Sequence, residues 1–484
     1  MKIAIVGSGP SGWAAAQKLI ELGHEIAIID SALGENDAYN FSKEQTSTRL
    51  NKKLFFGSDL PYRKFPVGPD LIKVDVDPIS SFTSGGLSLV WGATMLPYCK
   101  DDTKNWPFDI SILDSKFTEL SHKLPIAGTS DQLDSAYGQF YSRRPIFPSQ
   151  RIIQFIERVN KRKSEESIVG LSRLAVETGT NNIRGCIYCN KCISGCPSNL
   201  IWNSTGLTKV GKHLKMRVLK LAEVEDSVYV EGLGIDGVQI SGLKFDRIFL
   251  ATGPVESFRI LASSGVVQDC ATLKDSSTFF LPLFALPKLG KSKSNSFGLS
   301  QCFIRLKEDS FGPASQFQLY EYSDDLISRA RRAIPLGNLF PSMILKFFLT
   351  KIVVAIGYLD GQESPSIQMQ LLGDGSLELS RNKESKSLKQ QKHAINGAIK
   401  KLRKCIKRTG LIPLSFLNQI AKPGEGVHFG SWMPMGESSD LLGRPNGYQR
   451  IHVIDSSVLP SIAPGPITFT VMANAVRIVE ESMK

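Results

Sequence analysis

The sequence has no apolar run long enough to cross a bilayer. The nearest candidate is residues 339–349, which follow three arginines within 329–332. Pro341, Lys346 and the nearby Lys351 interrupt this stretch, whereas a spanning helix needs about 20 mostly apolar residues. We therefore expect a short helix packed on a sheet, and the alternative is a segment that lies in a membrane interface.

The sequence also lacks the marks of a repetitive or nucleic-acid-binding protein. It contains no repeat of fixed period and no low-complexity tract, which excludes solenoids and compositionally biased tails. The basic stretch 387–408 has no interleaved aromatic residues, so nucleic acid is not an expected partner. We expect a solvated surface helix there, and the alternative is peripheral membrane contact through 329–350 and 387–408.

No secretory signal is recognisable at the start. Residues 1–7 lack a basic region ahead of an apolar core, and no small-residue cleavage site follows. We therefore expect a cytoplasmic protein, held at the inner face of the membrane if the two stretches named above bind lipid.

The composition is that of a globular protein. The 484 residues are 42% apolar and 21% charged, with 41 Gly and 25 Pro, which excludes disordered, fibrous and collagen-like chains and leaves room for two cores. The 58 Lys and Arg exceed the 46 Asp and Glu by 12. This net charge favours acidic partners without identifying them.

Half of the eight cysteines form one compact run. They have the C-x2-C-x2-C-x3-C-P spacing of bacterial ferredoxins and are Cys186, Cys189, Cys192 and Cys196. In a reducing compartment this spacing favours metal or redox use over disulfides. We expect a 4Fe-4S or 3Fe-4S cluster, and the alternatives are a zinc site and a metal-free segment. The other four are expected to be small buried hydrophobic residues: Cys99, Cys270, Cys302 and Cys405.

A dinucleotide-binding unit is predicted at the start of the chain. Residues 3–6 and 25–29 have the apolar, β-branched character of strands, and 13–22 have helical spacing. Between the first strand and the helix stand Gly7, Gly9 and Gly12 in G-x-G-x-x-G spacing, and Asp30 ends the second strand. Glycines at these positions allow a tight turn and close approach to a pyrophosphate, and the carboxylate can accept from a ribose hydroxyl.

Later segments extend this unit and add a second one. A strand is predicted at 247–250, and the chain ends with a strand at 451–454 and a helix at 468–481. Alternating strands between 277 and 411, such as 366–370 and 377–379, predict a second domain with an antiparallel sheet. The expected boundaries are 1–125, 205–276 and 420–484 for the dinucleotide-binding domain, 126–204 for a connecting segment with the cysteine run, and 277–419 for the second domain.

Several motifs together resemble the glucose-methanol-choline (GMC) oxidoreductases, a flavoenzyme family. They follow one another along the chain as GGLSLVWG at 85–92, NWPFD at 105–109, GPVESFRILASSG at 253–265, HFGSWMPMG at 428–436 and VIDSSVLP at 453–460. The resemblance implies an α/β fold in which a Rossmann-like FAD-binding domain, assembled from discontinuous segments, carries an α+β substrate domain. It also implies bound FAD and oxidation of an alcohol.

The resemblance extends the set of cofactor-binding residues beyond the three glycines and Asp30. The additional positions are Gly85, Gly86, Ser88, Trp91, Gly253, Asp455 and Ser456. No histidine lies in or near 85–92, so we expect FAD to be held noncovalently.

His428 is the expected catalytic base. Oxidation of a CH–OH group needs a base for the hydroxyl proton and an acceptor for the hydride, which the flavin N5 provides. Among six histidines, His428 alone lies in a glycine-flanked loop that carries a motif; a purely structural histidine is the alternative. The family pattern implies a second His or Asn where this chain has Pro466, which leaves His428 alone or with Thr468 or Ser431 as its partner.

The sequence therefore predicts an FAD-dependent dehydrogenase. Its expected substrate is a polar alcohol or sugar, free or lipid-linked, and its electrons pass to an acceptor other than oxygen, through the iron–sulfur cluster if one is bound. Two alternatives remain open. One is a flavin and iron–sulfur electron-transfer protein without alcohol chemistry, and the other is a flavin-dependent epimerase with no net redox change.

Overall fold

We describe the protein from a computed structural model of the chain. The described residues are 1–33, 58–162, 164–180, 183–209, 211–290, 297–323 and 341–484. The arginines within 329–332, and with them most of the first stretch expected to contact a membrane, lie outside these ranges.

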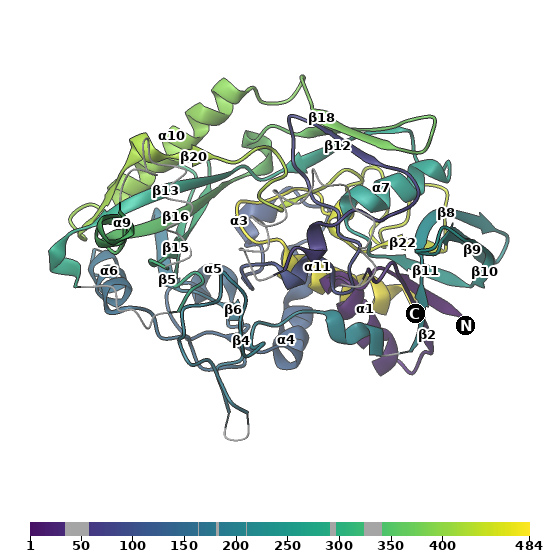
Figure 1. Ribbon diagram of the computed structural model, residues 1–484, viewed down its shortest axis with the longest axis horizontal. Helices are drawn as coiled ribbons and strands as arrows, with labels where there is room; N and C mark the ends of the chain where they lie inside the picture. The colour runs from purple at the N-terminus through teal and green to yellow at the C-terminus, as the bar shows by residue number, and fades with distance from the viewer. Residues whose placement is uncertain (34–57, 163, 181–182, 210, 291–296, 324–340) are drawn as a thin grey trace.

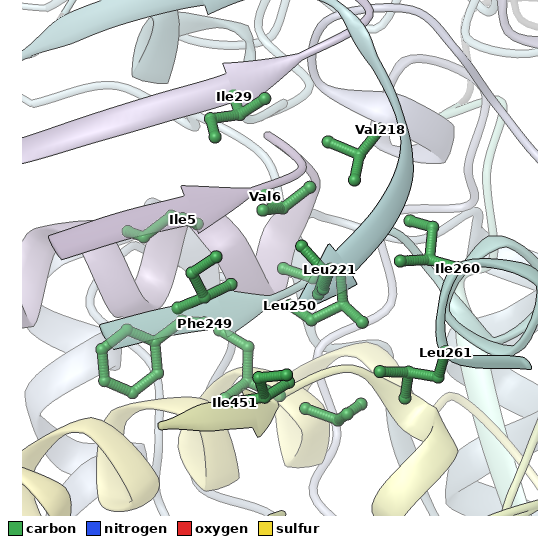
Figure 2. Close-up of a cluster of buried hydrophobic side chains, with 14 of the residues drawn as sticks. Ile5, Val6, Ile29, Val218, Leu221, Phe249, Leu250, Ile260, Leu261 and Ile451 are labelled. Atoms are coloured by element: carbon green, nitrogen blue, oxygen red, sulfur yellow. The ribbon is translucent and has the colours of Figure 1, made fainter. Parts of the chain in front are cut away.

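One half of the molecule is built on a five-stranded parallel sheet, with strand order β22-β11-β1-β2-β7 (Figure 1). The strands are β1 (Ile3–Val6), β2 (Ile26–Asp30), β7 (Lys212–Lys215), β11 (Arg247–Leu250) and β22 (Ile451–Val453). The three central strands are continuous apolar runs because both faces of a parallel sheet are buried. Figure 2 shows this core, where Val6, Leu250 and Ile451 of the sheet meet Leu261 of a helix.

Helices cover this sheet and shape the glycine turn. Pro10 begins α1 (Pro10–Glu21), three residues before the predicted start, because proline is well suited to the first position of a helix. Beside α1 lies α11 (Thr468–Ser482). The remaining helices of this half and of the connection are α3 (Lys100–Thr103), α4 (Asp114–Lys123), α5 (Asp134–Tyr137) and α7 (Pro254–Ser263).

The other half is built on a seven-stranded antiparallel sheet, with order β19-β13-β16-β15-β14-β5 and β20 paired to β13. Its strands are β5 (Ser167–Leu171), β13 (Thr278–Ala285), β14 (Cys302–Leu306), β15 (Ser315–Tyr320), β16 (Ile352–Leu359), β19 (Leu411–Pro413) and β20 (Gln419–Ile420). The predicted α/β class, with a discontinuous dinucleotide-binding half and an antiparallel second half, is confirmed.

Two helices cover one face of this antiparallel sheet. They are α6 (Gln150–Asn160) and α10 (Leu388–Cys405), which pack side chains such as Phe155 and Leu402 onto alternate strand residues, among them Leu281 and Val353. Ser387, the first residue of the predicted helix, is the N-cap of α10 and forms a capping box with Gln390. The side chains that these helices bury form a core of their own on this face of the sheet.

Two strand pairings cross the predicted domain boundaries. The hairpin of β17 (Ile367–Leu371) and β18 (Leu377–Arg381) joins β12 (Cys270–Asp275), β21 (Phe429–Gly430) and β3 (Leu71–Val74), and its inward side chains belong to the core of the parallel half. In turn, β5 of the connecting segment completes the antiparallel sheet. The remaining strands are β4 (Ile126–Ala127), β6 (Leu174–Ala175), β8 (Arg217–Val224), β9 (Ser227–Leu233) and β10 (Gln239–Phe245).

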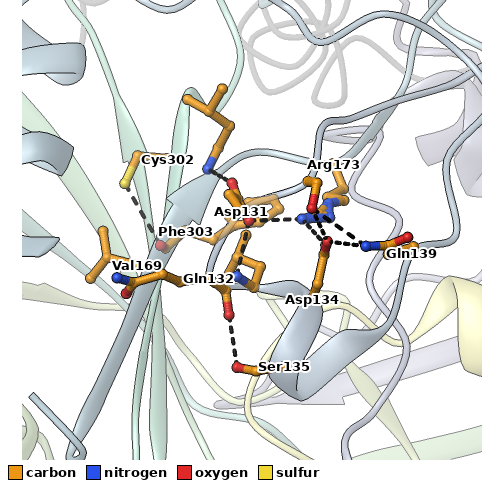
Figure 3. Close-up of polar contacts among 12 residues, drawn as sticks. Asp131, Gln132, Asp134, Ser135, Gln139, Val169, Arg173, Cys302 and Phe303 are labelled. Atoms are coloured by element: carbon orange, nitrogen blue, oxygen red, sulfur yellow. Dashed lines mark hydrogen bonds and ion pairs between the residues drawn. The ribbon is translucent and has the colours of Figure 1, made fainter. Parts of the chain in front are cut away.

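Buried ion pairs fasten the antiparallel sheet to its surroundings. Arg305 of β14 donates to both carboxylate oxygens of Asp102 on α3, at 2.8 and 2.9 Å. Figure 3 shows a second cluster, in which Arg173 bridges Asp131 and Asp134 at 2.8 Å each. Loss of one partner of a buried pair typically costs about 3–5 kcal/mol, so the Arg305–Asp102 pair ties β14 firmly to α3.

The short helix expected near 339–349 is present but exposed. It is α9 (Ser342–Leu349), and of its described apolar side chains Leu345 is buried whereas Met343 is 83% exposed and Phe347 59% exposed. The expectation of a helix packed on the sheet is therefore wrong for most of its surface. Nowhere in the described part of the chain is a helix both long and apolar enough to span a membrane.

Candidate active site

The three glycines of the first turn each have a different reason to be glycine. Gly7 has φ +101°, and a Cβ there would collide with the carbonyl oxygen of Ala251. A Cβ on Gly12 would collide with the carbonyl oxygen of Gly7, so helix and strand pack closely there. A Cβ on Gly9 would meet no atom within 4 Å, because Gly9 faces a cavity at the start of α1. The turn thus offers open backbone where a pyrophosphate would lie.

Asp30 stands at the carboxyl end of β2 and lines the same cavity. Its carboxylate accepts from the backbone N–H groups of Ser8, at 2.8 Å, and Ala32, at 2.6 Å. Burial nevertheless raises the pKa of this carboxyl above its ordinary value. These bonds fix the side chain at the cavity, and its expected contact with a ribose hydroxyl stays a prediction.

A buried hydrogen-bond network joins the glycine turn to the 85–92 segment. The backbone N–H of Gly85 donates to Ser8 Oγ at 2.9 Å, and Ser88 Oγ donates to the Gly85 carbonyl at 2.6 Å. Ser204 completes the network, since its hydroxyl donates to the Ser8 carbonyl at 2.8 Å and its N–H donates to Ser88 Oγ at 3.0 Å. Gly86 and Ser88 line the cavity, whereas Gly12 and Gly85 lie behind its wall.

Ser88 and Trp91, both expected to contact the cofactor, use their polar atoms inside the protein. The Ser88 hydroxyl is engaged as described above, and the indole N–H of Trp91 donates to the Trp202 carbonyl at 2.9 Å. Trp202 meets Trp13 and Trp91 edge-on, with ring centroids 5.2 and 5.9 Å apart. Both side chains lie in the cavity wall, so their contribution to a bound cofactor is one of surface shape.

The late-chain residues expected at the cofactor come to the same cavity. Gly253, Asp455 and Ser456 all line it. Asp455 accepts from Ser257 Oγ at 2.5 Å and from the N–H of Ser457 at 2.9 Å. Ser456 Oγ donates to the Phe429 carbonyl at 2.8 Å, which ties this end of the cavity to the loop that holds His428.

A buried charge cluster in the wall was not predicted. Glu256 bonds Arg259 at 2.8 Å and Arg217 at 3.3 Å, and burial lowers the pKa of Arg217 from its ordinary value. Arg217 also lies over the ring of Phe82, 4.7 Å from its centroid, and both Arg217 and Glu256 line the cavity. Glu256 and Arg259 both lie on α7, inside the 253–265 motif, whereas Arg217 comes from β8, so the motif alone does not indicate the cluster.

His428 lies in the wall of this cavity, just before β21. Burial lowers its pKa to about 4, so the imidazole is neutral at pH 7 and can accept a proton. Its Nδ1 has no hydrogen-bond partner among the described residues, and its ring centroid is 4.8 Å from that of Tyr358. These contacts give no support to the alternative, a histidine whose role is only to bond the loop backbone.

Two residues were expected as candidates for a side chain that shares the proton with His428, namely Ser431 and Thr468. Ser431 Oγ donates to the Pro460 carbonyl at 3.0 Å, so its proton is directed away from His428. Pro466 and Thr468 both line the cavity. Thr468 therefore stays a candidate for the proton-handling partner.

All the lining residues named above surround a single cavity of about 1470 Å³. Pockets for a single small molecule usually measure roughly 300–1000 Å³. The cavity therefore has room for a dinucleotide together with a second molecule.

The cysteine run does not form a metal site in this structure. Cys192 is buried, which raises its pKa to about 12, and the other three are half-buried. The sulfurs of Cys186 and Cys196 accept backbone N–H groups two and four residues on. Within the described ranges, no three His, Cys, Asp or Glu side chains are placed to hold one metal ion. The thiols thus do not fit the predicted cluster, and Cys270, expected to be buried, is exposed.

The comparisons with known proteins rest on structure. No family model matches the sequence, and no curated protein sequence matches it. Among solved structures, pyridoxine 4-oxidase from Mesorbium loti is similar, with a TM-score of 0.63 at 16% sequence identity over 99% of this chain and 98% of that chain. The likeness extends over both halves of the molecule and shows that the chain as a whole has a known fold. This result agrees with the resemblance carried by the motifs.

Proposed function

We propose that the protein is an FAD-dependent oxidoreductase of the GMC type that oxidises a CH–OH group of an alcohol. One observation carries the proposal: a single cavity joins the open backbone at Gly9 and the carboxylate of Asp30 to the neutral imidazole of His428. The protein of similar structure is an oxidase of pyridoxine. This is consistent with alcohol chemistry in this fold.

The residues around the cavity fit FAD. Gly9 leaves space for a pyrophosphate at the start of α1, Asp30 is placed for a ribose, and Asp455 and Ser456 line the same cavity. Bound FAD supplies an acceptor for a hydride, which no side chain of the protein can provide. The protein binds it noncovalently, because no histidine occurs at the 85–92 segment.

His428 takes the hydroxyl proton. A base must be unprotonated before reaction, and burial keeps His428 in that form at pH 7, with its pKa lowered to about 4. The Tyr358 ring restrains one side of the imidazole. Where the family pattern has a second polar side chain, Pro466 can neither accept nor donate a proton, so the protein relies on His428 for this step, alone or with Thr468 as its partner.

Alcohol oxidation is favoured over the electron-transfer alternative. That alternative requires a metal centre on the cysteine run, and the described thiols are not arranged as ligands. The epimerase alternative uses the same cavity and differs in having no net redox change. Wash-in of deuterium without an added acceptor would distinguish an epimerase from an oxidoreductase.

The test is anaerobic reduction of the FAD-loaded protein by a panel of alcohols, followed by stopped-flow absorbance. The parent protein should bleach the flavin with at least one alcohol, and His428→Ala should slow bleaching by about 10²–10⁴-fold while FAD stays bound. His393→Ala, on the exposed surface of α10, is the matched control. A His428→Ala rate within a few-fold of the parent would contradict the assignment of the base.

The electron acceptor needs a separate measurement. With the cluster unsupported, we propose only that reduced flavin passes its electrons to an acceptor outside the chain. Oxygen consumption compared with reduction of a soluble dye, under the same alcohol, would separate an oxidase from a dehydrogenase.

A further inference from the structure

The antiparallel sheet turns an apolar face toward the cavity. Its strands β13 and β16 bury alternate residues under α6 and α10, and the intervening residues line the cavity instead. Three cross-strand pairs make up this lining: Phe280 with Ile356, Pro282 with Val354, and Phe284 with Ile352. We call these six side chains the apolar strip.

The strip is long and begins at the proposed base. Tyr358, whose ring neighbours His428, stands two residues beyond Ile356 on the same strand face. From Tyr358 to Ile352 the strand advances by six residues, or about 20 Å. The cavity therefore extends away from His428 by the length of a long extended chain.

Polarity changes along this path. Near His428 the lining includes Thr278, which pairs with Tyr358. Gln318 and Tyr320 of β15 lie beside the strip, opposite Ile356 and Val354, and the Tyr320 hydroxyl donates to Gln318 Oε1 at 3.1 Å. At the other end the lining includes Phe348 of α9 and Phe416, which are 58% and 82% exposed. One end thus suits a hydroxyl group, and the other is apolar and open to the outside.

We infer that the substrate is an alcohol whose reacting carbon ends a long apolar chain, which lies along the apolar strip. This inference rests on the proposed function and names its substrate class. It replaces the expected polar alcohol or sugar, because a sugar would leave its hydroxyl groups unpaired against the strip. The alcohol loses its hydroxyl proton to His428 and a hydride to FAD, and it leaves as the carbonyl compound.

The first experiment varies chain length. The FAD-loaded protein is given primary alcohols from butanol to hexadecanol, then isoprenoid alcohols from prenol to geranylgeraniol, and kcat/KM for flavin reduction is measured. Each methylene that reaches the strip should raise kcat/KM about three- to fourfold until the strip is full. Comparison of the two series shows which kind of apolar chain fits better.

A variant tests the strip itself. Val354→Trp places an indole in the middle of the strip, so long alcohols should lose at least tenfold in kcat/KM while butanol is unaffected. Val224→Trp adds the same side chain at a 53% exposed position in the other half of the molecule and should change neither. Equal losses for butanol and hexadecanol in Val354→Trp would contradict the inference.

Equilibrium binding separates this inference from the proposed function. Dialysis against radiolabelled hexadecanol should show binding to the parent protein and at least tenfold weaker binding to Val354→Trp. Binding without flavin reduction would uphold the inferred chain site and overturn alcohol oxidation. Flavin reduction with no dependence on chain length, and no hexadecanol binding, would overturn the chain site and uphold alcohol oxidation.

Discussion

The neutral state of His428 makes a specific pH dependence predictable. The ordinary pKa of histidine is 6.5, and burial lowers that of His428 to about 4. The unprotonated base is therefore fully present above about pH 5 and is lost only as the pH falls through about 4. We expect flavin reduction by an alcohol to be insensitive to this group from about pH 5 to 8, with an acid limb near 4. If the rate of flavin reduction instead fell near pH 6.5, the imidazole of His428 would be solvated and the prediction would be contradicted.

The buried carboxyl of Asp275, beside the loop that holds His428, should make the stability of the protein depend on pH. It is buried opposite Phe429, accepts from the Gly424 N–H at 3.1 Å, and its second oxygen has no partner among the described residues. Burial raises its pKa from 3.8 to about 7. Between these values the folded protein holds a proton that the unfolded chain has lost, so the free energy of unfolding falls as pH rises, by up to about 4 kcal/mol.

Asp275→Asn should remove this dependence. Relative to the parent, the variant's free energy of unfolding should rise between about pH 4 and pH 8, on the order of 1–4 kcal/mol by urea denaturation. Glu384→Gln, which changes an exposed carboxylate, is the control. Its free energy of unfolding should follow that of the parent over the same pH range. A constant difference between Asp275→Asn and the parent would mean that Asp275 is ionised throughout.

Within the first turn, two glycines should respond differently to the same substitution. Gly9→Val directs its side chain into the cavity, so we expect a folded protein that retains little FAD after gel filtration. Gly12→Val forces a clash with the Gly7 carbonyl, so it should lose about 1–3 kcal/mol of stability even without FAD. Full flavin retention by Gly9→Val would place the pyrophosphate elsewhere.

For the cysteine run we expect a structural role without metal. The protein purified anaerobically should carry flavin with less than one iron or zinc per chain. Serine at Cys186, Cys189 and Cys196, which are half-buried, should leave the absorption spectrum unchanged, whereas serine at the buried Cys192 should lower the melting temperature. Stoichiometric iron and sulfide would show that the thiols rearrange around a cluster.

Local patterns in the sequence predict the elements that carry the cofactor. Residues 3–6 and 247–250 are strands as expected, because a buried parallel strand is recognisable from its apolar run. Which distant strands pair with one another is harder to predict from sequence. The hairpin β17–β18 has the predicted form but joins β12 and β3, since alternation gives a strand's buried face without naming its partner.

The site is only partly recoverable from sequence for the same reason. His428 and Asp30 lie in motifs, and both reach the cavity. Ser204 and Tyr358 lie in no motif, and they matter because folding brings them to Ser8 and to His428. Likewise, the exposure of α9 depends on what surrounds the helix, which its apolar composition does not reveal.

As a whole, the molecule combines a positive net charge with an exposed apolar helix. The net charge is +12, and Met343, Ile344 and Phe347 of α9 project from the end of the protein where the apolar strip opens. We propose peripheral contact with an anionic membrane through α9, which would shorten the path of an apolar alcohol into the cavity. The cytoplasmic location stays a prediction.

Vesicle co-sedimentation tests this contact. Phe347 is exposed and outside the cavity lining, so Phe347→Ser should weaken binding to phosphatidylserine-containing vesicles several-fold without changing flavin content. Phe311→Ser alters a phenylalanine of similar exposure that lies in a turn between β14 and β15, and it is the matched control. Equal binding by both variants and the parent would contradict a role for α9.

The parallel sheet has a consequence for biosynthesis. Its centre is formed by residues 3–6, but its outer strand is residues 451–453, and Asp455 follows that strand into the cavity wall. At about 5–20 residues per second, the ribosome adds the outer strand roughly 20–90 s after the first one. The nascent chain therefore spends that time with an incomplete sheet, and the cavity is complete only after residues 451–456 are made. Removal of residues 451–484 should yield flavin-free chains.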